Sequence, residues 1–209
     1  MKKYLVEFIG TFFLTATVAT AAVCGTAGDF APVAIGLVLM VMVFAGGHIS
    51  GAHYNPAVTL GVLLRGRCEG RDAVPYVLAQ LAGGFVGAVV SQVLVPTAVV
   101  KAQAFPSTLP PVLAEFIFTF ALVYVVLQTA TAKGTSGNSF YGLAIGSIVL
   151  VGAFTVGSIS LGGFNPAVSF TLAIVGKLGW ADLWIHLVPQ LVAAVAAAFT
   201  FKALLPEDR

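Results

Sequence analysis

The tripeptide Asn-Pro-Ala occurs twice in this chain, each time inside an apolar stretch, and this repetition limits the possible folds more than any other feature. A single copy says little, because Asn at the N-cap and Pro at the first helical position can begin any helix. The surroundings match as well, since residues 48–59 read HISGAHYNPAVT and residues 158–169 read SISLGGFNPAVS. The chain is therefore an internal duplication. The two tripeptides are Asn55-Pro56-Ala57 and Asn165-Pro166-Ala167.

The composition indicates a protein that lies in a lipid bilayer. Of the 209 residues, 59% are hydrophobic and only 9% are charged, whereas soluble domains carry roughly 25% charged residues. The net charge of +2 is small and the basic residues are scattered, so we expect no nucleic-acid partner. The two cysteines, Cys24 and Cys68, have no metal-ligand spacing and no evident disulfide partner. We expect neither a metal nor a cofactor.

Six apolar stretches have the roughly 20 residues that a helix needs to cross about 30 Å of hydrocarbon. Two shorter apolar pieces remain, and each is soon followed by a cation, Arg65 or Lys177. Residues 55–64 and 165–175 would each cover about half of the bilayer at 1.5 Å per residue. We therefore expect an all-α membrane protein with six transmembrane helices and two re-entrant half-helices. The six long stretches are residues 4–26, 31–49, 73–95, 111–132, 140–159 and 180–204.

The distribution of Lys and Arg predicts the orientation, because cytoplasmic loops carry the excess of positive charge. With the N-terminus inside, the outer segments hold only Lys101 and Lys177. We therefore expect an integral protein of the cell (inner or plasma) membrane with both termini in the cytoplasm. The basic residues then assigned to the cytoplasmic side are Lys2, Lys3, Arg65, Arg67, Arg71, Lys133, Lys202 and Arg209.

The duplication extends beyond the two tripeptides. Glu7 and Glu115 begin the matching segments EFIGTF and EFIFTF, and Gln80 and Gln190 follow the two tripeptides at equal spacing. Each half then contains three spans and one half-helix. Because three is odd, the second half crosses the membrane in the opposite sense, and such inverted repeats place a functional site near the midplane between the halves. The two halves of this single domain are about residues 1–105 and 106–209.

A helix that starts in mid-membrane exposes N–H groups that hydrocarbon cannot satisfy, so the loop before it must be buried or line water. In an inverted repeat the two starts meet, and Ala57 and Ala167 are small enough to allow contact. Each N-terminus is equivalent to about +0.5 elementary charge, so the centre repels cations. The amides of Asn55 and Asn165 can donate to a passing oxygen, which indicates a pore for small neutral molecules. Backbone acceptors along it are expected at Gly51, Ala52, His53, Gly162 and Gly163.

Over essentially its whole length the chain resembles the aquaporin and aquaglyceroporin (major intrinsic protein) channels. The resemblance rests on the two Asn-Pro-Ala repeats, the SGAHY segment at residues 50–54 and the two Glu-Phe-Ile-x-Thr-Phe starts. It implies six helices, two half-helices, one pore per subunit and a homotetramer. It also implies that Glu7 and Glu115 brace the half-helix loops by accepting backbone N–H bonds, and that His48 is a pore-side or loop-bracing residue.

The main departure from the family pattern lies after the second Asn-Pro-Ala. Family members usually have an arginine there, which narrows the outer pore and repels cations, but this chain has Val168. The resemblance implies a selectivity filter of Ile35, Ala153, Gly162 and Val168. Water-selective members typically place an aromatic residue and a histidine at the positions of Ile35 and Ala153, and neither is present here. We therefore expect a wide, wholly apolar filter without a fixed charge.

These features predict passive permeation of water and of small uncharged solutes, such as glycerol-like polyols, urea and arsenite or other metalloid hydroxides. A strict water channel is an alternative, and so are an ion-coupled secondary transporter and a junctional protein. The transporter needs ion-coordinating groups in the membrane, and only Glu7 and Glu115 qualify. We expect no enzyme, because no nucleophile–base pair or metal cluster is evident.

The remaining histidines and small residues leave further alternatives. His53 is expected to hydrogen-bond within its loop, with a pH gate as the other reading, and His186 is expected at the membrane interface. Clusters of small residues indicate close helix contacts, either within the subunit or between subunits. These clusters are Gly83, Gly84 and Gly87, Gly142 and Gly146, and residues 193–198.

Overall fold

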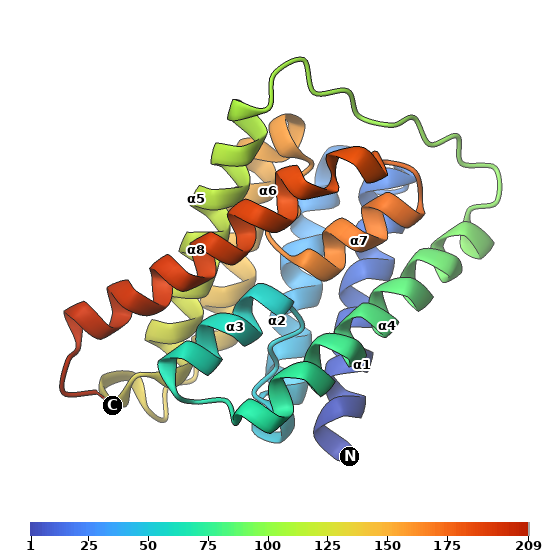
Figure 1. Cartoon of the computed structure of the whole chain (residues 1–209). Coiled ribbons are helices and arrows are strands. Elements are labelled where there is room, and N and C mark those ends of the chain that lie inside the picture. Colours follow the sequence, from blue (N-terminus) through green and yellow to red (C-terminus); the bar gives the residue numbers. More distant parts are fainter. Residues whose placement is uncertain (209) are drawn as a thin grey trace.

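The computed structural model describes residues 1–208, and over that range it is a bundle of α-helices (Figure 1). Six helical segments in it are long and apolar enough to cross a membrane. Two shorter helices, α3 (Pro56–Arg65) and α7 (Pro166–Ile174), start at the two Asn-Pro-Ala tripeptides. This confirms the predicted fold class. The long helices are α1 (Lys2–Thr17), α2 (Ala31–Ser50), α4 (Gly70–Leu94), α5 (Leu109–Val126), α6 (Tyr141–Ser160) and α8 (Leu183–Leu204).

The first long helix of each half ends in a π-helical segment, which the hydropathy pattern did not indicate. α1 continues as Val18–Val23 and α5 continues as Leu127–Thr131. Short π-helical segments are often found at functional sites. Here Val18, which begins the first segment, and Val126, which directly precedes the second, both line the cavity at the centre of the molecule. The change of helical pitch therefore occurs where the two helices form the cavity wall.

Packing of the long helices follows the duplication, with α1 against α4 in the first half and α5 against α8 in the second. α4 approaches α1 closely because glycine faces it. A Cβ atom added at Gly83 would lie 2.6 Å from the Phe8 carbonyl oxygen, and one at Gly87 would lie 2.2 Å from Thr15 Oγ1. A Cβ atom at Gly146 of α6 would lie 2.5 Å from a carbonyl oxygen of α2. These small residues therefore serve contacts within the subunit.

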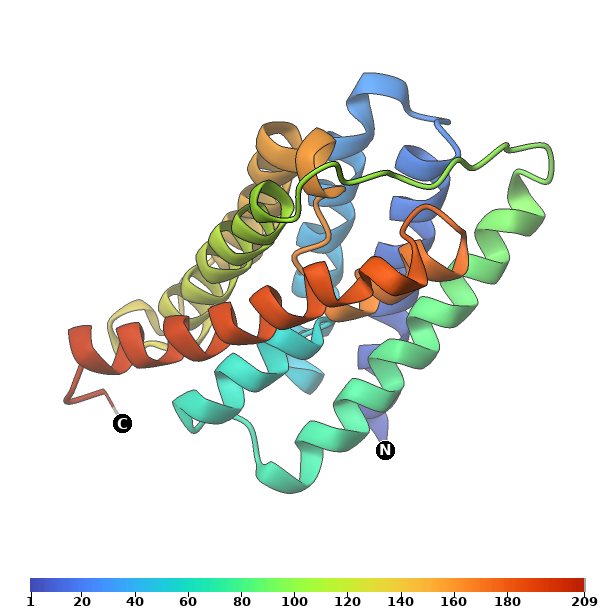
Figure 2. The same cartoon turned by 45° about the horizontal axis from the view of Figure 1, so that its top comes forward.

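The two short helices begin as their sequences predict. Asn55 Oδ1 accepts from the N–H of Ala57 at 2.8 Å, and Asn165 Oδ1 accepts from the N–H of Ala167 at 2.9 Å. The residue after each Asn is proline, which lacks an N–H and is preorganised for the first helical position. Seen from two directions, α3 and α7 lie between the long helices and point their N-termini at each other (Figures 1 and 2).

The N-terminus and the last described residues lie at the same end of the bundle, which we call the terminal end (Figure 1). There the C-terminal segment is tied to the end of α3. Asp208 Oδ1 accepts from Arg65 Nη2 at 2.6 Å, and Asp208 Oδ2 accepts from the backbone N–H of Lys133 at 2.7 Å. The buried Arg65 guanidinium also lies over the Phe201 ring, 4.4 Å from its centroid. Arg209, which belongs to the predicted cytoplasmic set, lies outside the described residues.

We predict that replacing Asp208 by Ala lowers the thermal stability of the purified protein by several degrees, because Arg65 is then left buried without its carboxylate. The Lys133 N–H bond and the Arg65 charge hold the pKa of the Asp208 carboxyl below its usual value. Its stabilising effect is therefore present above the unfolded pKa of about 3.9 and is lost as the pH falls through the lower folded pKa.

A melting curve in detergent between neutral pH and about pH 3 measures this effect. Glu207→Gln is the matched control, since the Glu207 side chain is exposed and its replacement removes the same charge from the same segment. Identical melting temperatures for Asp208→Ala and Glu207→Gln would contradict the prediction.

Candidate pore

A buried carboxylate holds the loop that precedes α3. Glu7 is fully buried in α1 and accepts four hydrogen bonds. Its Oε1 accepts from Ser50 Oγ at 2.7 Å and from the backbone N–H of His53 at 3.0 Å. Its Oε2 accepts from the backbone N–H of Tyr54 at 2.7 Å and from Gln80 Nε2 at 2.8 Å. One side chain thus satisfies the N–H groups that the non-helical backbone exposes inside the bundle.

The second half repeats this arrangement atom for atom. Glu115 of α5 is also fully buried. Its Oε1 accepts from Ser160 Oγ at 2.7 Å and from the Gly163 N–H at 2.9 Å. Its Oε2 accepts from the Phe164 N–H at 2.7 Å and from Gln190 Nε2 at 2.7 Å. A carboxylate that receives four donors can stay buried, because hydrogen bonding replaces its hydration.

Each half has a histidine beside its glutamate network, but the two histidines come from different segments of the chain. His53 lies in the first loop, and its Nδ1 is 3.1 Å from Thr59 Oγ1. The equivalent position in the second loop is Gly163, and the space is filled by His186 of α8, whose Nδ1 is 3.0 Å from Ser169 Oγ. A Cβ atom on Gly163 would lie 2.8 Å from His186 Nδ1. The expectation that His186 lies at the membrane interface was therefore wrong, since it is fully buried.

The loops also share an unusual backbone path. Three residues in each loop have positive φ, and several of them are not glycine. Such conformations cost free energy for residues with a Cβ, and they persist only where the surroundings hold them. The four hydrogen bonds to each glutamate provide that restraint. The residues with positive φ are Gly51, Ala52 and Tyr54 in the first loop and Leu161, Gly162 and Phe164 in the second.

This path leaves a series of carbonyl groups without partners within residues 1–208. The oxygens concerned accept no hydrogen bond from any described group. Buried carbonyl groups are normally paired with protein or water. Most of these residues line the central cavity described below, so their carbonyls are available to a molecule that passes through it. They are Gly51, Ala52, His53, Gly162 and Gly163, the residues that the sequence analysis proposed as backbone acceptors.

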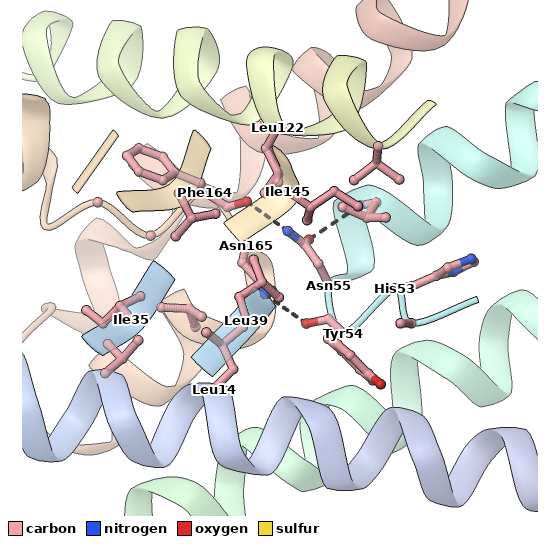
Figure 3. Close-up of a pocket in the computed structure, with 18 residues that line it drawn as sticks. Leu14, Ile35, Leu39, His53, Tyr54, Asn55, Leu122, Ile145, Phe164 and Asn165 are labelled. Atoms are coloured by element: carbon pink, nitrogen blue, oxygen red, sulfur yellow. Dashed lines mark hydrogen bonds between the residues drawn. The ribbon is translucent and has the colours of Figure 1, made fainter. Parts of the chain in front are cut away.

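The two asparagines meet at the centre of the bundle, and each donates to the opposite loop (Figure 3). Asn55 Nδ2 donates to the Phe164 carbonyl oxygen at 2.9 Å, and Asn165 Nδ2 donates to the Tyr54 carbonyl oxygen at 2.9 Å. An amide NH₂ group carries two hydrogens. One hydrogen of each amide therefore fastens the two halves together. The second has no partner in the described part of the chain, and both asparagines line the central cavity.

The electrostatic character of this centre follows from the two helix starts. α3 and α7 both present their N-termini here, and each is equivalent to about +0.5 elementary charge. Within residues 1–208 no charged side chain lines the central cavity, and most of its wall is aliphatic. The electrostatic potential at this site is therefore positive, although no charged side chain of the described residues lies on its wall. A neutral molecule with an oxygen acceptor fits these groups better than a cation does.

Three cavities follow one another through the molecule. The central cavity has a volume of about 30 Å³ and surrounds the two asparagines. It shares His53, Val126 and Ile145 with a cavity of about 900 Å³ at the terminal end, which we call the terminal cavity. At the other end it shares Val18 and Ile35, among others, with a cavity of about 330 Å³, which we call the distal cavity. The narrow centre has room for about one or two water molecules.

The four residues expected to form a filter lie where the central and distal cavities join. Ile35 and Gly162 line both cavities, Val168 lines the central cavity and Ala153 lines the distal one. None of the four carries a charge or a polar side chain. His48 is exposed in the terminal cavity and makes no hydrogen bond with a described residue. His48 thus lies beside the terminal cavity, and Ser50 is the residue nearby that bonds to Glu7.

Sequence reasoning did not assign a role to several residues of these networks. Gln80 and Gln190 were noted only for their equal spacing, yet each donates both to a glutamate and to the hydroxyl group that follows its Asn-Pro-Ala. Ser50 and Ser160 were noted only as part of the repeat. The signal was present, because a polar residue duplicated at a fixed distance inside an apolar span is costly unless it has a buried partner.

Comparison with known proteins agrees with this geometry. The family model described as "Major intrinsic protein" matches residues 1–201, and the chain belongs to this family of membrane channels. It is 34% identical to "Aquaporin NIP1-1" of Zea mays over 98% of this chain and 75% of that protein. It is 33% identical to "Glycerol uptake facilitator protein-like 6" of Lactiplantibacillus plantarum over the full length of both.

Solved structures agree as well. The X-ray structure of the aquaglyceroporin from Plasmodium falciparum matches with a TM-score of 0.74 at 25% sequence identity, and the match covers 98% of this chain and 97% of that one. The protein is thus an integral membrane protein with the fold of an aquaglyceroporin.

We predict that Glu7→Gln lowers the free energy of unfolding by roughly 2–4 kcal/mol, since one acceptor oxygen becomes a donor and leaves a buried N–H or O–H group unpaired. Glu115→Gln should have an effect of similar size, because its four donors are equivalent. Unfolding by denaturant in mixed micelles measures both. Glu69→Gln is the control, because Glu69 and its partner Arg71 are exposed. If all three variants unfold alike, the bracing role is contradicted.

Proposed function

We propose that this channel conducts water and small uncharged solutes, namely glycerol-like polyols, urea and undissociated metalloid hydroxides such as arsenite. The observation that carries the proposal is the join between the central and distal cavities, where the described residues Ile35, Ala153, Gly162 and Val168 offer neither a charged nor an aromatic side chain. A passing hydroxyl group finds donors at the two asparagine amides and acceptors at the loop carbonyls. A cation is opposed at the centre by the positive ends of two helices, and within residues 1–208 no acidic side chain lines the central cavity to offset them.

The relatives support this class of solute. One is named a glycerol uptake facilitator-like protein, others are named aquaporins, and the solved structure is that of an aquaglyceroporin. The four residues named above act in this proposal as the selectivity filter. Because none of them donates a hydrogen bond through its side chain, they select by size and polarity, while the asparagine centre excludes ions.

A strict water channel is the second candidate, and one observation favours it. The central cavity of about 30 Å³ is closer to the size of water than to that of glycerol. Passage of a polyol therefore requires aliphatic side chains such as Leu39 and Val149 to change rotamer as the solute passes. Side-by-side swelling of proteoliposomes in water, glycerol, urea and arsenite gradients separates the two candidates.

We also infer the setting of the channel. At the terminal end, Arg65, Arg67 and Lys133 lie beside Asp208, and this basic cluster supports a cytoplasmic placement of both termini in the cell membrane. The first repeat ends near residue 105 and the second begins near residue 106. The long helices expose aliphatic residues such as Leu5 and Val151 to lipid or to neighbouring subunits. Four copies then assemble as a homotetramer, with one pore in each.

We predict that solute flux in liposomes follows only the solute's own gradient. Glu7 and Glu115 are fully buried in the spans, and each is already saturated by four donors, so neither is free to bind a coupling ion. Asp72, a third buried acid, lies in the first turn of α4 and is paired with Lys3 and Tyr4. Imposing a pH or sodium gradient should leave the rate of glycerol entry unchanged. Accumulation of glycerol against its gradient when an ion gradient is imposed would replace the channel by an ion-coupled transporter.

We predict that Val168→Arg reduces glycerol flux by about tenfold or more and water flux by much less, because a long charged side chain narrows the neutral join between the cavities. Val168→Met is the matched control, since it adds volume without charge. Stopped-flow light scattering on proteoliposomes measures both fluxes. If water and glycerol fluxes are both unchanged in Val168→Arg, Val168 does not line the constriction.

A further inference from the structure

The wall of the distal cavity includes a basic residue, whereas the filter has none. Most residues on its wall are aliphatic or glycine, and Gln103 and Ser158 are polar. Lys177 is the one charged residue on this wall among the described residues. The cavity joins the centre through Ile35 and Gly162, so a molecule that enters from this end meets Lys177 before it reaches the filter.

The backbone N–H and the backbone carbonyl group of Lys177 both form hydrogen bonds. Its N–H donates to the Leu172 carbonyl oxygen of α7 at 2.9 Å, and its carbonyl oxygen accepts from the Gln103 N–H at 2.9 Å. The second bond attaches the long segment between α4 and α5 to the end of α7. Lys177 is therefore held beside the cavity by the half-helix that carries Val168 and by the loop that covers the mouth.

No acidic side chain neutralises this lysine within the described part of the chain. The acids near this end are Asp29, in the turn Gly28–Phe30, and Asp182, in the turn Trp180–Asp182. Neither has an oxygen within 4.0 Å of the Lys177 ammonium group. Its charge therefore acts on the cavity without a paired carboxylate to cancel it.

We propose that Lys177 is a specificity-determining residue of this channel, which supplies at the distal mouth the cation barrier that Val168 does not supply at the filter. The inference rests on the proposed function and adds to it a second electrostatic barrier, in series with the helix starts at the asparagine centre. An ammonium group on the wall of a cavity with low-dielectric walls raises the energy of a cation there and sets no such barrier against a neutral solute. Its three N–H donors can also orient the hydroxyl groups of an entering polyol.

A purely structural role for Lys177 makes a different prediction. Lys177 closely follows α7, and a cation near a helix C-terminus stabilises that helix through its dipole. In that case neutralising Lys177 would lower the stability of the protein and leave ion selectivity unchanged. The two roles therefore separate when ion leak and melting temperature are measured on the same preparations.

The experiment compares wild type with Lys177→Gln, Lys177→Glu and Lys177→Arg in proteoliposomes. Lys101→Gln is the matched control, because Lys101 is an exposed lysine on the same loop as Gln103 and does not line the cavity. Water and glycerol fluxes are recorded by light scattering, and sodium and potassium leak by fluorescent indicators inside the vesicles. Melting temperatures of the same proteins are recorded in detergent.

We expect Lys177→Gln to raise the ratio of cation leak to water flux on the order of threefold to tenfold, and Lys177→Glu to raise it further. Lys177→Arg and Lys101→Gln should behave as wild type. Raising the ionic strength with an impermeant salt from about 0.02 M to about 0.5 M should shrink the difference between Lys177→Gln and wild type.

Cation leak in Lys177→Gln and Lys177→Glu equal to that of wild type, with neutral solute flux intact, would overturn the assignment. So would a leak in Lys101→Gln as large as that in Lys177→Gln. A different result would contradict the proposed function itself, namely that wild type shows no solute or water flux above that of empty liposomes.

Discussion

Each re-entrant loop leaves the helical pattern of hydrogen bonds in the interior of the molecule, and one carboxylate accepts from the N–H groups that it exposes. Glu7 and Glu115 each receive two backbone N–H groups, one serine hydroxyl and one glutamine amide. This interaction fixes the strained backbone path, and the path in turn aims the starts of α3 and α7 at each other. The cavity, its carbonyl acceptors and its positive centre all depend on the two carboxylates.

Much of this was predictable from the sequence, because it depends on local patterns and on duplication. The length of the apolar pieces after Asn55 and Asn165 predicted half-helices, and the resemblance to the channel family implied that Glu7 and Glu115 brace the loops. What the sequence left undetermined are contacts between segments that are distant in the chain and have no counterpart in the other half. His186 replaces a loop histidine because residue 163 is glycine, a compensation that only the spatial overlap of α8 with the second loop shows.

The same limit applies to the ends of the helices and to the charged residues. The π-helical ends of α1 and α5 do not alter hydropathy, so a pattern of apolar residues cannot indicate them. The pairing of Arg65 with Asp208 joins residues that are far apart in the chain. Likewise, the sequence marked Lys177 as a cation that follows a half-helix on the outer side, and its position on the wall of the distal cavity depends on how α7 ends.

The amides of Asn55 and Asn165 each serve two tasks with one group, since one hydrogen ties the halves together and the other faces the passage. Substitution there would loosen the seam between the repeats at the same time as it changed what the passage recognises. Under the proposed function, solute preference can therefore diverge more easily at Ile35, Ala153 and Val168, whose side chains make no hydrogen bond with the described residues. A fold of this kind can change the solute that it conducts while the pair of asparagines at its centre stays the same.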